Sequence, residues 1–422
     1  MKVFKFGGAS VKDADALRNV SSILSAYAGE KLLVIVSAMG KTTNKLEEIV
    51  QALYTQDHHV YNQSVDALKQ AHINILNALF PTKHPIFETC NSLFDLLTST
   101  YKKPDISKFS FEYDQIVSIG ELISSHILTA FLIQEGHAAL WSDARQLIRT
   151  DNTFQEGNVD WDTTESLIQK QLMPNFEQFD IQITQGFIGH TKDGYTTTLG
   201  REGSDYTAGI VAYCTNAEQV VIWKDVPGML NADPKFFENT VKLEQISFRE
   251  AIELSYYGAS VIHPKTIKPL QNKGIPLFVK SFLQPKEVGT IIQSSTEKDH
   301  LIPSFIVKKD QVLFSITTRD FSFIVEEHLS DIFERLARMK QTINLMQNSA
   351  LDFSILLDRV KIDPELLLRE FKDDYTIRYN EGLELVTIRH YDQNTMGRLT
   401  NNKEIILEQK TRQTARLVLK NK

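Results

Sequence analysis

A lysine and two adjacent glycines lie almost at the start of the chain, directly after a short apolar stretch. The segment Lys5-Phe6-Gly7-Gly8-Ala9-Ser10 follows Val3-Phe4, which predicts a strand that runs into a tight turn. Adjacent glycines let backbone N–H groups approach an anion, Lys5 adds a positive charge, and Ser10 could cap a following helix. These residue types indicate a phosphate-binding turn. Gly-Gly pairs occur in ordinary turns more often than in phosphate sites, so the phosphate-binding interpretation depends on the other motifs of the chain.

A second group of polar residues surrounds an arginine in the middle of the chain. It reads Thr196-Thr197-Thr198-Leu199-Gly200-Arg201-Glu202-Gly203-Ser204-Asp205 and precedes a predicted helix. Arginine binds a carboxylate in bidentate fashion, and Asp205 could orient a lysine or organise a metal near a helix N-terminus that favours anions. Helix capping by Ser204 and Asp205, after a strand at Thr196–Thr198, is the plainer interpretation. It does not explain a glycine-flanked arginine, so we favour a binding function.

Three further clusters are ambiguous when each is taken alone. Lys224-Asp225-Val226-Pro227-Gly228 is typical of an exposed turn, and Ser118-Ile119-Gly120-Glu121 of the first turn of a helix. Gly40-Lys41-Thr42 resembles the end of a P-loop, but Ile35 stands where that motif requires a glycine. We therefore interpret the loop Ser37–Asn44 as a polar substrate lining.

The elements that must position these residues alternate between strand and helix, which predicts a mainly parallel sheet covered by helices. Ligands of such sheets lie beyond the carboxyl ends of the strands, where the clusters fall. The predicted strands are Lys2–Phe6, Leu32–Val36, Ala138–Trp141, Ile181–Thr184, Gln219–Trp223 and Pro276–Val279. The predicted helices are Asp13–Ala28, Thr43–Leu53, Glu112–Leu132, Ser204–Thr215, Phe248–Tyr257 and Pro264–Lys273.

A polar connector near residues 295–310 separates a second region with a different pattern. The order there is strand, helix, strand, strand, helix, strand, which matches a ferredoxin-like unit. These elements are Val312–Thr317, Glu326–Met339, Thr342–Asn348, Asp352–Leu357, Pro364–Phe371 and Leu383–Arg389. A last strand pair is predicted at Ile405–Gln409 and Ala415–Leu419.

Composition excludes several classes of function. The 422 residues carry a formal net charge of −7 and no basic run, which argues against nucleic-acid binding. Two cysteines, Cys90 and Cys214, are too few for a disulfide framework or a Cys-rich zinc site. We find no signal-peptide pattern and no apolar run of about 20 residues, so we expect a cytoplasmic protein without a membrane segment.

Taken together and in order, the clusters resemble those of aspartokinases. The motifs that carry this resemblance are Lys5-Phe6-Gly7-Gly8, Ser37-Ala38 with Thr43-Asn44, Ser118–Glu121, Gln185-Gly186-Phe187, Thr198–Asp205, Lys224–Gly228 and Tyr257-Gly258-Ala259 with His263-Pro264. The resemblance covers essentially the whole chain. It implies an amino-acid kinase catalytic domain at 1–295 and an ACT-type regulatory region at 305–422, whose second ACT unit is truncated.

The resemblance implies that Mg-ATP phosphorylates the β-carboxylate of L-aspartate, the first step towards lysine, threonine, methionine and isoleucine. Lys5 would neutralise charge on the transferring phosphoryl group, and Asp205 would orient Lys5. Arg201 would bind a substrate carboxylate and Glu121 the ammonium group. The positions that match ATP contacts are Lys5, Gly7, Gly8, Ala9, Ser10, Lys224, Asp225, Leu230, Lys235, Ser260 and Val261. Those that match aspartate contacts are Ser37, Thr43, Glu121, Thr198, Arg201, Gly203 and Ser204.

The chain departs from the family pattern at three positions of this site. Glu202 stands where many aspartokinases have glycine, so its side chain must point away from the backbone approach or the pocket differs. Ser260 replaces a lysine that contacts ATP, and nearby Lys265 is a candidate substitute. Leu230 replaces a tyrosine of some relatives, which predicts weaker adenine contacts.

The sequence does not decide whether the regulatory region binds an effector. Thr342, Ile343 and Asn344 match the effector segment of the family, but Asn344 replaces a frequent aspartate, which would weaken recognition of a cationic amino acid. The chain ends at Lys422 and has no room for a fused homoserine dehydrogenase, so we expect a monofunctional protein, and a homodimer through ACT units. Two alternatives remain: another amino-acid or carbamate kinase, and a catalytically silent amino-acid sensor.

Overall fold

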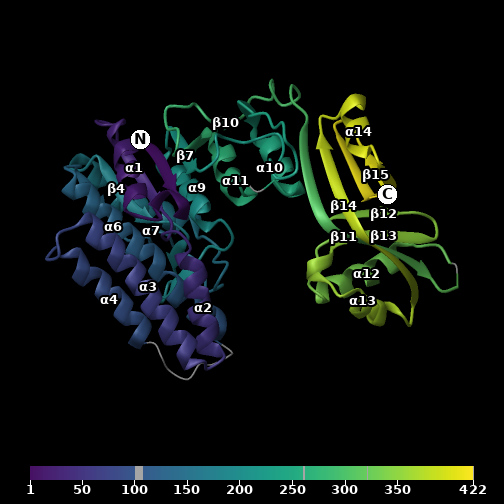
Figure 1. Ribbon diagram of the computed structural model, residues 1–422, viewed down its shortest axis with the longest axis horizontal. Helices are drawn as coiled ribbons and strands as arrows, with labels where there is room; N and C mark the ends of the chain where they lie inside the picture. Colours follow the sequence, from purple (N-terminus) through teal and green to yellow (C-terminus); the bar gives the residue numbers. More distant parts are fainter. Residues whose placement is uncertain (100–107, 260–261, 321, 422) are drawn as a thin grey trace. The chain divides into compact units, whose positions relative to one another are not determined.

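The computed structural model describes residues 1–99, 108–259, 262–320 and 322–421 (Figure 1). The chain forms two compact units. The first consists of Met1–Met229, Lys242–Ile252 and Val261–Thr296. The second consists of Leu230–Val241, Glu253–Ser260 and Glu297–Lys422.

An eight-stranded sheet forms the centre of the first unit, with the strand order β3-β4-β2-β1-β7-β9-β10-β8. All pairings are parallel except that between β9 and β10. The bounds are β1 Lys2–Phe6, β2 Leu32–Val36, β3 Ala139–Trp141, β4 Ile181–Gln185, β7 Gln219–Lys224, β8 Gln245–Ser247, β9 Leu277–Ser281 and β10 Thr290–Gln293. A separate hairpin pairs β5 (Ile188–His190) with β6 (Thr196–Thr198).

Helices cover this sheet, as the alternating pattern predicts. Their bounds are α1 Ala14–Ser25, α2 Thr42–Tyr54, α3 His58–Leu79, α4 Ile86–Ser99, α5 Phe109–Val117, α6 Ile119–Gln134, α7 Ala144–Leu147, α8 Trp161–Gln171, α9 Gly203–Thr215 and α11 Pro264–Lys273. Helix α10 (Phe248–Tyr257) begins in the first unit, and its residues from Glu253 onward belong to the second. Phe4 and Phe6 of β1 pack with α1, α2, α3, α4 and α6 in the main core. Because successive side chains of a strand point to opposite faces, Lys5 points to the other face, where α9 contacts β1 and β7.

The long helix predicted over Glu112–Leu132 is two helices, α5 and α6, that meet at Ser118. The stretch Phe109–Gln134 has the length and mean hydropathy (1.8) of a membrane span, but 83% of that window is buried inside the protein. A helix that is apolar on all sides is expected in a protein core. Gly120 lets α6 lie close to the loop after β2, since a Cβ there would be 3.0 Å from Ala38 and Thr42.

Two predicted helix caps are wrong. The turn after β1 is a short 3₁₀ helix over Gly8–Val11, and the Ser10 hydroxyl donates to the Trp223 carbonyl instead of capping a helix. Asp13 caps α1, because its carboxylate accepts from the Ala16 N–H at 2.8 Å. Helix α9 begins at Gly203 without a side-chain cap, so neither Ser204 nor Asp205 has that role.

The second unit contains a six-stranded antiparallel sheet with the order β12-β13-β11-β14-β16-β15. The bounds are β11 Ser304–Thr318, β12 Leu345–Asn348, β13 Asp352–Asp358, β14 Tyr375–Arg389, β15 Lys403–Lys410 and β16 Thr414–Asn421, with helices α12 Glu326–Arg338, α13 Pro364–Phe371 and α14 Gln393–Thr400. The first four strands and two helices give the ferredoxin-like order expected from the sequence. Strands β11 and β14 are 15 residues long each, and the far part of β14 pairs with β16.

Candidate active site

Lys5 and Asp205 form a buried ion pair at the carboxyl end of the parallel sheet. Lys5 Nζ lies 2.7 Å from Oδ1 of Asp205, and Lys224 Nζ lies 3.5 Å from Oδ2 of the same carboxylate. Burial raises the pKa of Asp205, but the charges of Lys5 and then Lys224 outweigh it, and the net pKa is lowered. Strands β1 and β7 are neighbours, so the two lysines converge on one carboxylate at the first turn of α9.

A cleft of about 620 Å³ opens beside this ion pair, within the size range of small-molecule sites. Its lining comes from strand ends and helix starts of the first unit. The lining residues are Lys5, Ser37, Thr43, Glu47, Tyr113, Glu121, Gln155, Glu156, Phe187, Thr198, Gly200, Arg201, Glu202, Gly203, Ser204, Asp205 and Lys224.

Glu121 places a buried carboxylate in this cleft. Its side chain is fully buried on α6; Oε1 accepts from the Ala38 N–H at 3.3 Å, and Oε2 has no hydrogen-bond partner among the described residues. Burial raises the pKa of Glu121 to about 8, against opposing effects from the Ala38 hydrogen bond and the charge of Lys5. An unpartnered buried carboxylate oxygen in a cleft suits a cationic group of a ligand.

Arg201 faces the same cleft from the loop before α9. Its side chain is exposed and makes no ion pair within the described part of the chain. The loop has unusual backbone angles, with φ of 75° at Gly200 and 53° at Glu202. It also packs closely, because a Cβ at Gly203 would lie 2.6 Å from Phe187. The tight loop therefore holds a free guanidinium, a group that binds carboxylates in bidentate fashion.

Asp114 is a functional candidate that the sequence analysis missed. This fully buried residue of α5 accepts from the Thr198 hydroxyl at 2.7 Å, the Thr198 N–H at 2.9 Å and the Gln155 N–H at 2.9 Å. Burial raises the pKa of Asp114, although these hydrogen bonds oppose the shift. Asp114 thus fixes two segments of the cleft wall. A single aspartate in the helical pattern of α5 gives no signal of this role.

The glycine turn lies beside the cleft. A Cβ at Gly8 would be 2.7 Å from the Gly40 carbonyl, and the Gly40 N–H donates to the Gly8 carbonyl at 3.0 Å. At Gly7, a Cβ would lie 3.3 Å from Lys5 Nζ. Glycine is needed at position 8 because the turn packs directly on the loop after β2.

All predicted aspartate-side residues line the cleft, together with the predicted catalytic residues Lys5 and Asp205 and with Lys224 from the predicted ATP side. The remaining ATP-side predictions are outside its lining. Gly7, Gly8, Ala9 and Ser10 form the neighbouring turn, and Asp225 is exposed after β7. Leu230 and Lys235 belong to the second unit. Ser260 and Val261 lie outside the described residues.

The predicted effector residues lie in the second unit, directly before β12 rather than within a strand. The side-chain oxygen of Asn344 accepts from Lys308 Nζ at 2.8 Å. Its amide nitrogen donates to Gln311 at 2.8 Å and to Asp358 at 2.7 Å. The amide of Asn344 is therefore fully engaged by the chain's own side chains.

Beyond Asp114, the sequence analysis missed Glu47, Tyr113, Gln155 and Glu156 in the lining. The Tyr113 hydroxyl donates to Glu47 at 2.6 Å, which joins α5 to α2 across one wall. Gln155 and Glu156 lie on a loop beside Gly200. A Cβ added to Gly200 would be 3.3 Å from the Gln155 carbonyl oxygen and 3.2 Å from Glu156 Cγ. No motif marks these positions, because tertiary packing alone brings them to the cleft.

Comparisons with known proteins agree with this arrangement. Residues 1–281 match the profile of the amino acid kinase family, which is the class that the sheet and the cleft define. The chain is 31% identical over 395 residues to lysine-sensitive aspartokinase 3 of Escherichia coli, covering 92% of this chain and 86% of the relative. The chain therefore belongs to the amino acid kinase family and, within it, to the aspartokinases.

Solved structures give the same result for the fold. Aspartokinase III of Escherichia coli, solved in complex with aspartate and ADP, superposes with a TM-score of 0.79 at 27% identity, over 100% of this chain and 96% of that one. The aspartate kinase of Clostridium acetobutylicum superposes with a TM-score of 0.82 at 22% identity, also over 100% and 96%. Both share the parallel sheet and the C-terminal region of this protein.

Proposed function

We propose that this chain transfers the terminal phosphoryl group of ATP to the β-carboxylate of L-aspartate, which gives 4-phospho-L-aspartate and ADP. One observation carries the substrate assignment: a free arginine and a buried glutamate, Arg201 and Glu121, share a cleft with the ion pair of Lys5 and Asp205. An amino acid with a second carboxylate presents the matching charges. A related structure with aspartate and ADP bound supports the proposal.

In the mechanism that follows, Arg201 binds the α-carboxylate and Glu121 the ammonium group of aspartate. This leaves the β-carboxylate directed at the end of the cleft where Lys5 and Lys224 lie. The attacking carboxylate is ionised at neutral pH and needs no general base. Lys5 stabilises the negative charge of the transferring phosphoryl group, and Asp205 keeps its ammonium in place.

We include magnesium in the proposal as the cation that binds together with ATP. The described residues contain no group of three or more His, Cys, Asp or Glu side chains that could hold a metal ion. The carboxylate nearest to the reaction, Asp205, is already paired with two lysines. Mg²⁺ commonly binds through substrate phosphates with few protein ligands, and this donor set fits such a mode. When bound, the ion would neutralise phosphate charge.

We further propose that the product enters lysine, threonine, methionine and isoleucine biosynthesis in the cytoplasm, and that the chain acts as a homodimer. The reaction itself supports the pathway, since acyl phosphates are activated for reduction or transfer. The low cysteine count supports a reducing compartment. We keep Thr342, Ile343 and Asn344 as the proposed effector segment.

An ADP-release assay with purified protein tests the proposed function. Aspartate, glutamate and N-acetylglutamate serve as separate acceptors at saturating ATP and Mg²⁺. We expect turnover with aspartate to be far higher than turnover with glutamate or N-acetylglutamate. Preference for another acceptor would indicate a different kinase of the family. Absence of turnover with every acceptor, in a protein that still binds amino acids, would favour the silent sensor.

A further inference from the structure

A second polar cavity, of about 430 Å³, lies in the first unit between α7, α8 and β5. It shares no lining residue with the catalytic cleft. Its lining consists of Asp143, Arg145, Gln146, Arg149, Leu167, Gln171, His190 and Gly194. The lining thus contains two arginines, one histidine and one carboxylate.

Arg149 is the unpaired cation of this cavity. Its backbone is fixed, because its N–H donates to Thr164 at 3.0 Å and its carbonyl accepts from the Asp160 N–H at 2.9 Å. Its guanidinium makes no ion pair within 4.0 Å in the described part of the chain, and its buried Nε has no hydrogen-bond partner there. Asp160 is near enough for Arg149 to contribute to its lowered pKa, but Asp160 is itself bound to Thr163. A buried guanidinium nitrogen without an acceptor is costly unless a ligand supplies one.

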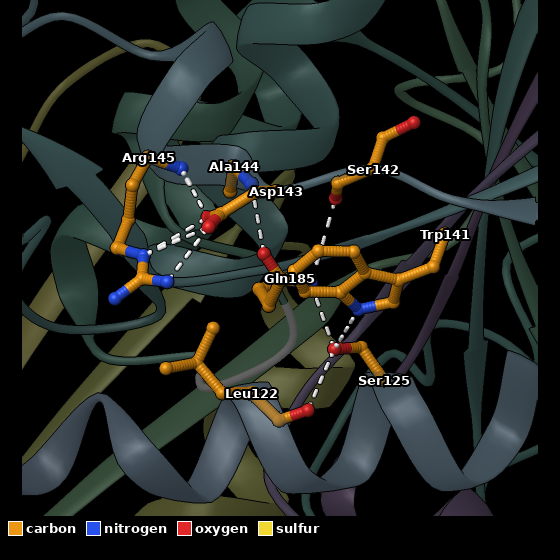
Figure 2. A network of polar contacts seen from close by, with 8 residues as sticks. All are labelled: Leu122, Ser125, Trp141, Ser142, Asp143, Ala144, Arg145 and Gln185. Atoms are coloured by element: carbon orange, nitrogen blue, oxygen red, sulfur yellow. Dashed lines mark hydrogen bonds and ion pairs between the residues drawn. The ribbon is translucent and has the colours of Figure 1, made fainter. Parts of the chain in front are cut away.

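Arg145 offers a second donor. Its Nε and Nη2 bind Asp143, at 2.7 Å for the shortest contact, and this leaves Nη1 without a hydrogen bond among the described residues. Figure 2 shows this remaining nitrogen pointing away from Asp143. The Asp143 carboxylate also accepts from the Arg145 N–H, so its position is fixed.

His190 adds a neutral imidazole to the lining. Its Nδ1 donates to the Ile148 carbonyl at 3.2 Å, which assigns the proton to that nitrogen in the neutral ring. Its pKa is lowered by burial first and by the charge of Arg149 second, with a further contribution from Arg145 and an opposing one from Asp143. The Ile148 hydrogen bond also opposes the shift, so Arg149 is the main charge that the ring senses.

We propose that this cavity is a binding site for a phosphate group, free or carried by a small organic molecule. Arginine forks match phosphate geometry, and Nε of Arg149 and Nη1 of Arg145 have no hydrogen bond among the described residues. The cavity is larger than a bare phosphate requires, which leaves room for an attached organic group. This site is separate from the substrates of the proposed kinase reaction.

The site adjoins the hairpin that reaches the catalytic cleft. His190 pairs with Thr196 across the hairpin of β5 and β6, and Thr150 Oγ1 lies 2.6 Å from Thr197 Oγ1. Thr198, the next residue, lines the cleft. A bound phosphate would add a contact between α7, α8 and the base of this hairpin, so binding should raise the melting temperature.

Isothermal titration with inorganic phosphate and, separately, with glycerol 3-phosphate tests the proposal. We expect wild type to bind at least one of the two, and Arg149→Gln to bind it at least about tenfold more weakly. Gln146→Glu changes an exposed lining residue and should weaken binding through charge repulsion without risk to the fold. If glycerol 3-phosphate binds more tightly than inorganic phosphate, the ligand is an organic phosphate. If the two bind equally, the site binds the free ion.

Two controls make the result specific. Lys170→Gln removes one positive charge from the exposed side of α8 without touching the cavity, and it should bind as wild type does. Arg201→Gln alters the catalytic cleft and should retain this binding. The proposal is overturned if wild type binds neither probe, if Arg149→Gln and Gln146→Glu both titrate as wild type, or if Arg201→Gln alone abolishes binding. Aspartate-dependent turnover is measured in a separate assay, so phosphate binding at this cavity and the proposed kinase activity can each fail without the other.

Discussion

Lys5 Nζ lies 2.7 Å from Oδ1 of Asp205, and both side chains are buried although they are 200 positions apart in the sequence. Lys224 contacts the other oxygen of the same carboxylate. Two positive charges therefore share one negative charge at the end of the cleft. The surplus of positive charge is what a phosphoryl group in transfer requires.

Lys5→Ala should lower turnover by about 10²–10³, the usual loss when a group that stabilises transition-state charge is removed. The fold should remain, although less stable, because Lys224 still pairs with the Asp205 carboxylate. Turnover by ADP release and the circular dichroism spectrum measure the two effects. Lys2→Ala, in the same strand but outside the cleft, is the matched control and should keep its activity. Near-normal turnover of Lys5→Ala would refute the assigned role.

Asp205→Asn should destabilise the protein by roughly 3 kcal/mol, because it leaves two lysines without their buried partner. The pKa of Asp205 is lowered in the folded protein, so its stabilising effect is present above the ordinary pKa of 3.8 and is lost as the pH falls through the lower folded value. Urea unfolding between pH 2 and pH 7 measures this. Wild type should lose stability towards acid more steeply than the variant, and parallel curves would contradict the ion pair.

Glu121 should give the substrate affinity a pH dependence. With its pKa raised to about 8, much of the free protein carries a proton on Glu121 at neutral pH, and only the ionised form attracts the ammonium group. The KM for aspartate should therefore fall as the pH rises from 6 towards 8. Glu121→Gln should show a high KM that does not follow this trend. Identical pH profiles for the two proteins would exclude Glu121 as the ammonium ligand.

The same raised pKa predicts a stability effect of the opposite sign to that of Asp205. Between the ordinary value of 4.5 and about 8, the folded chain holds a proton on Glu121 that the unfolded chain has released. Stability therefore falls as the pH rises through this window. Glu121→Gln removes the titration, so its melting temperature should exceed that of wild type at pH 8.5 and approach it at pH 5. A variant that is less stable at both pH values would contradict this.

Asp114→Asn tests whether Asp114 positions Thr198. Asparagine keeps one acceptor oxygen and carries no charge, so the hydrogen bonds from Thr198 and Gln155 lose their carboxylate acceptor and weaken, at a cost of about 1–3 kcal/mol. The KM for aspartate should rise about tenfold while kcat changes little, since Asp114 does not touch the reacting groups. A double-mutant cycle with Thr198→Val should give a coupling of about 0.5–3 kcal/mol. Additive effects would exclude the link.

Glu202 adopts a left-handed backbone conformation, with φ of 53° and ψ of 30°, which glycine accepts without a Cβ penalty. Glu202→Gly should therefore be more stable than Glu202→Ala by about 1 kcal/mol, because both remove the side chain and only alanine keeps the strained Cβ. Thermal unfolding of the pair measures the difference. Equal stability would show that the loop relaxes to another conformation.

The sequence by itself determined most of the fold and the identity of the chemical groups. The predicted bounds of β1, β2, α10, α11 and α13 are those of the structure, because hydrophobic period and turn residues act locally. Because side chains alternate along a strand, Lys5 lies on the face opposite to the core side chains Phe4 and Phe6. The ordered motifs then gave the family, and every predicted aspartate-side residue lines one cleft.

Only the tertiary structure decided which of these groups meet. Asp114 reaches Thr198 because α5 packs against β6, and Arg145 and Arg149 line one cavity because α7 packs against both α8 and β5. Such contacts depend on burial and on the packing of elements that are distant in sequence, and neither leaves a local pattern. The same reason explains the break at Ser118 and the caps that were assigned wrongly: a helix end is fixed by the neighbours that satisfy its backbone groups.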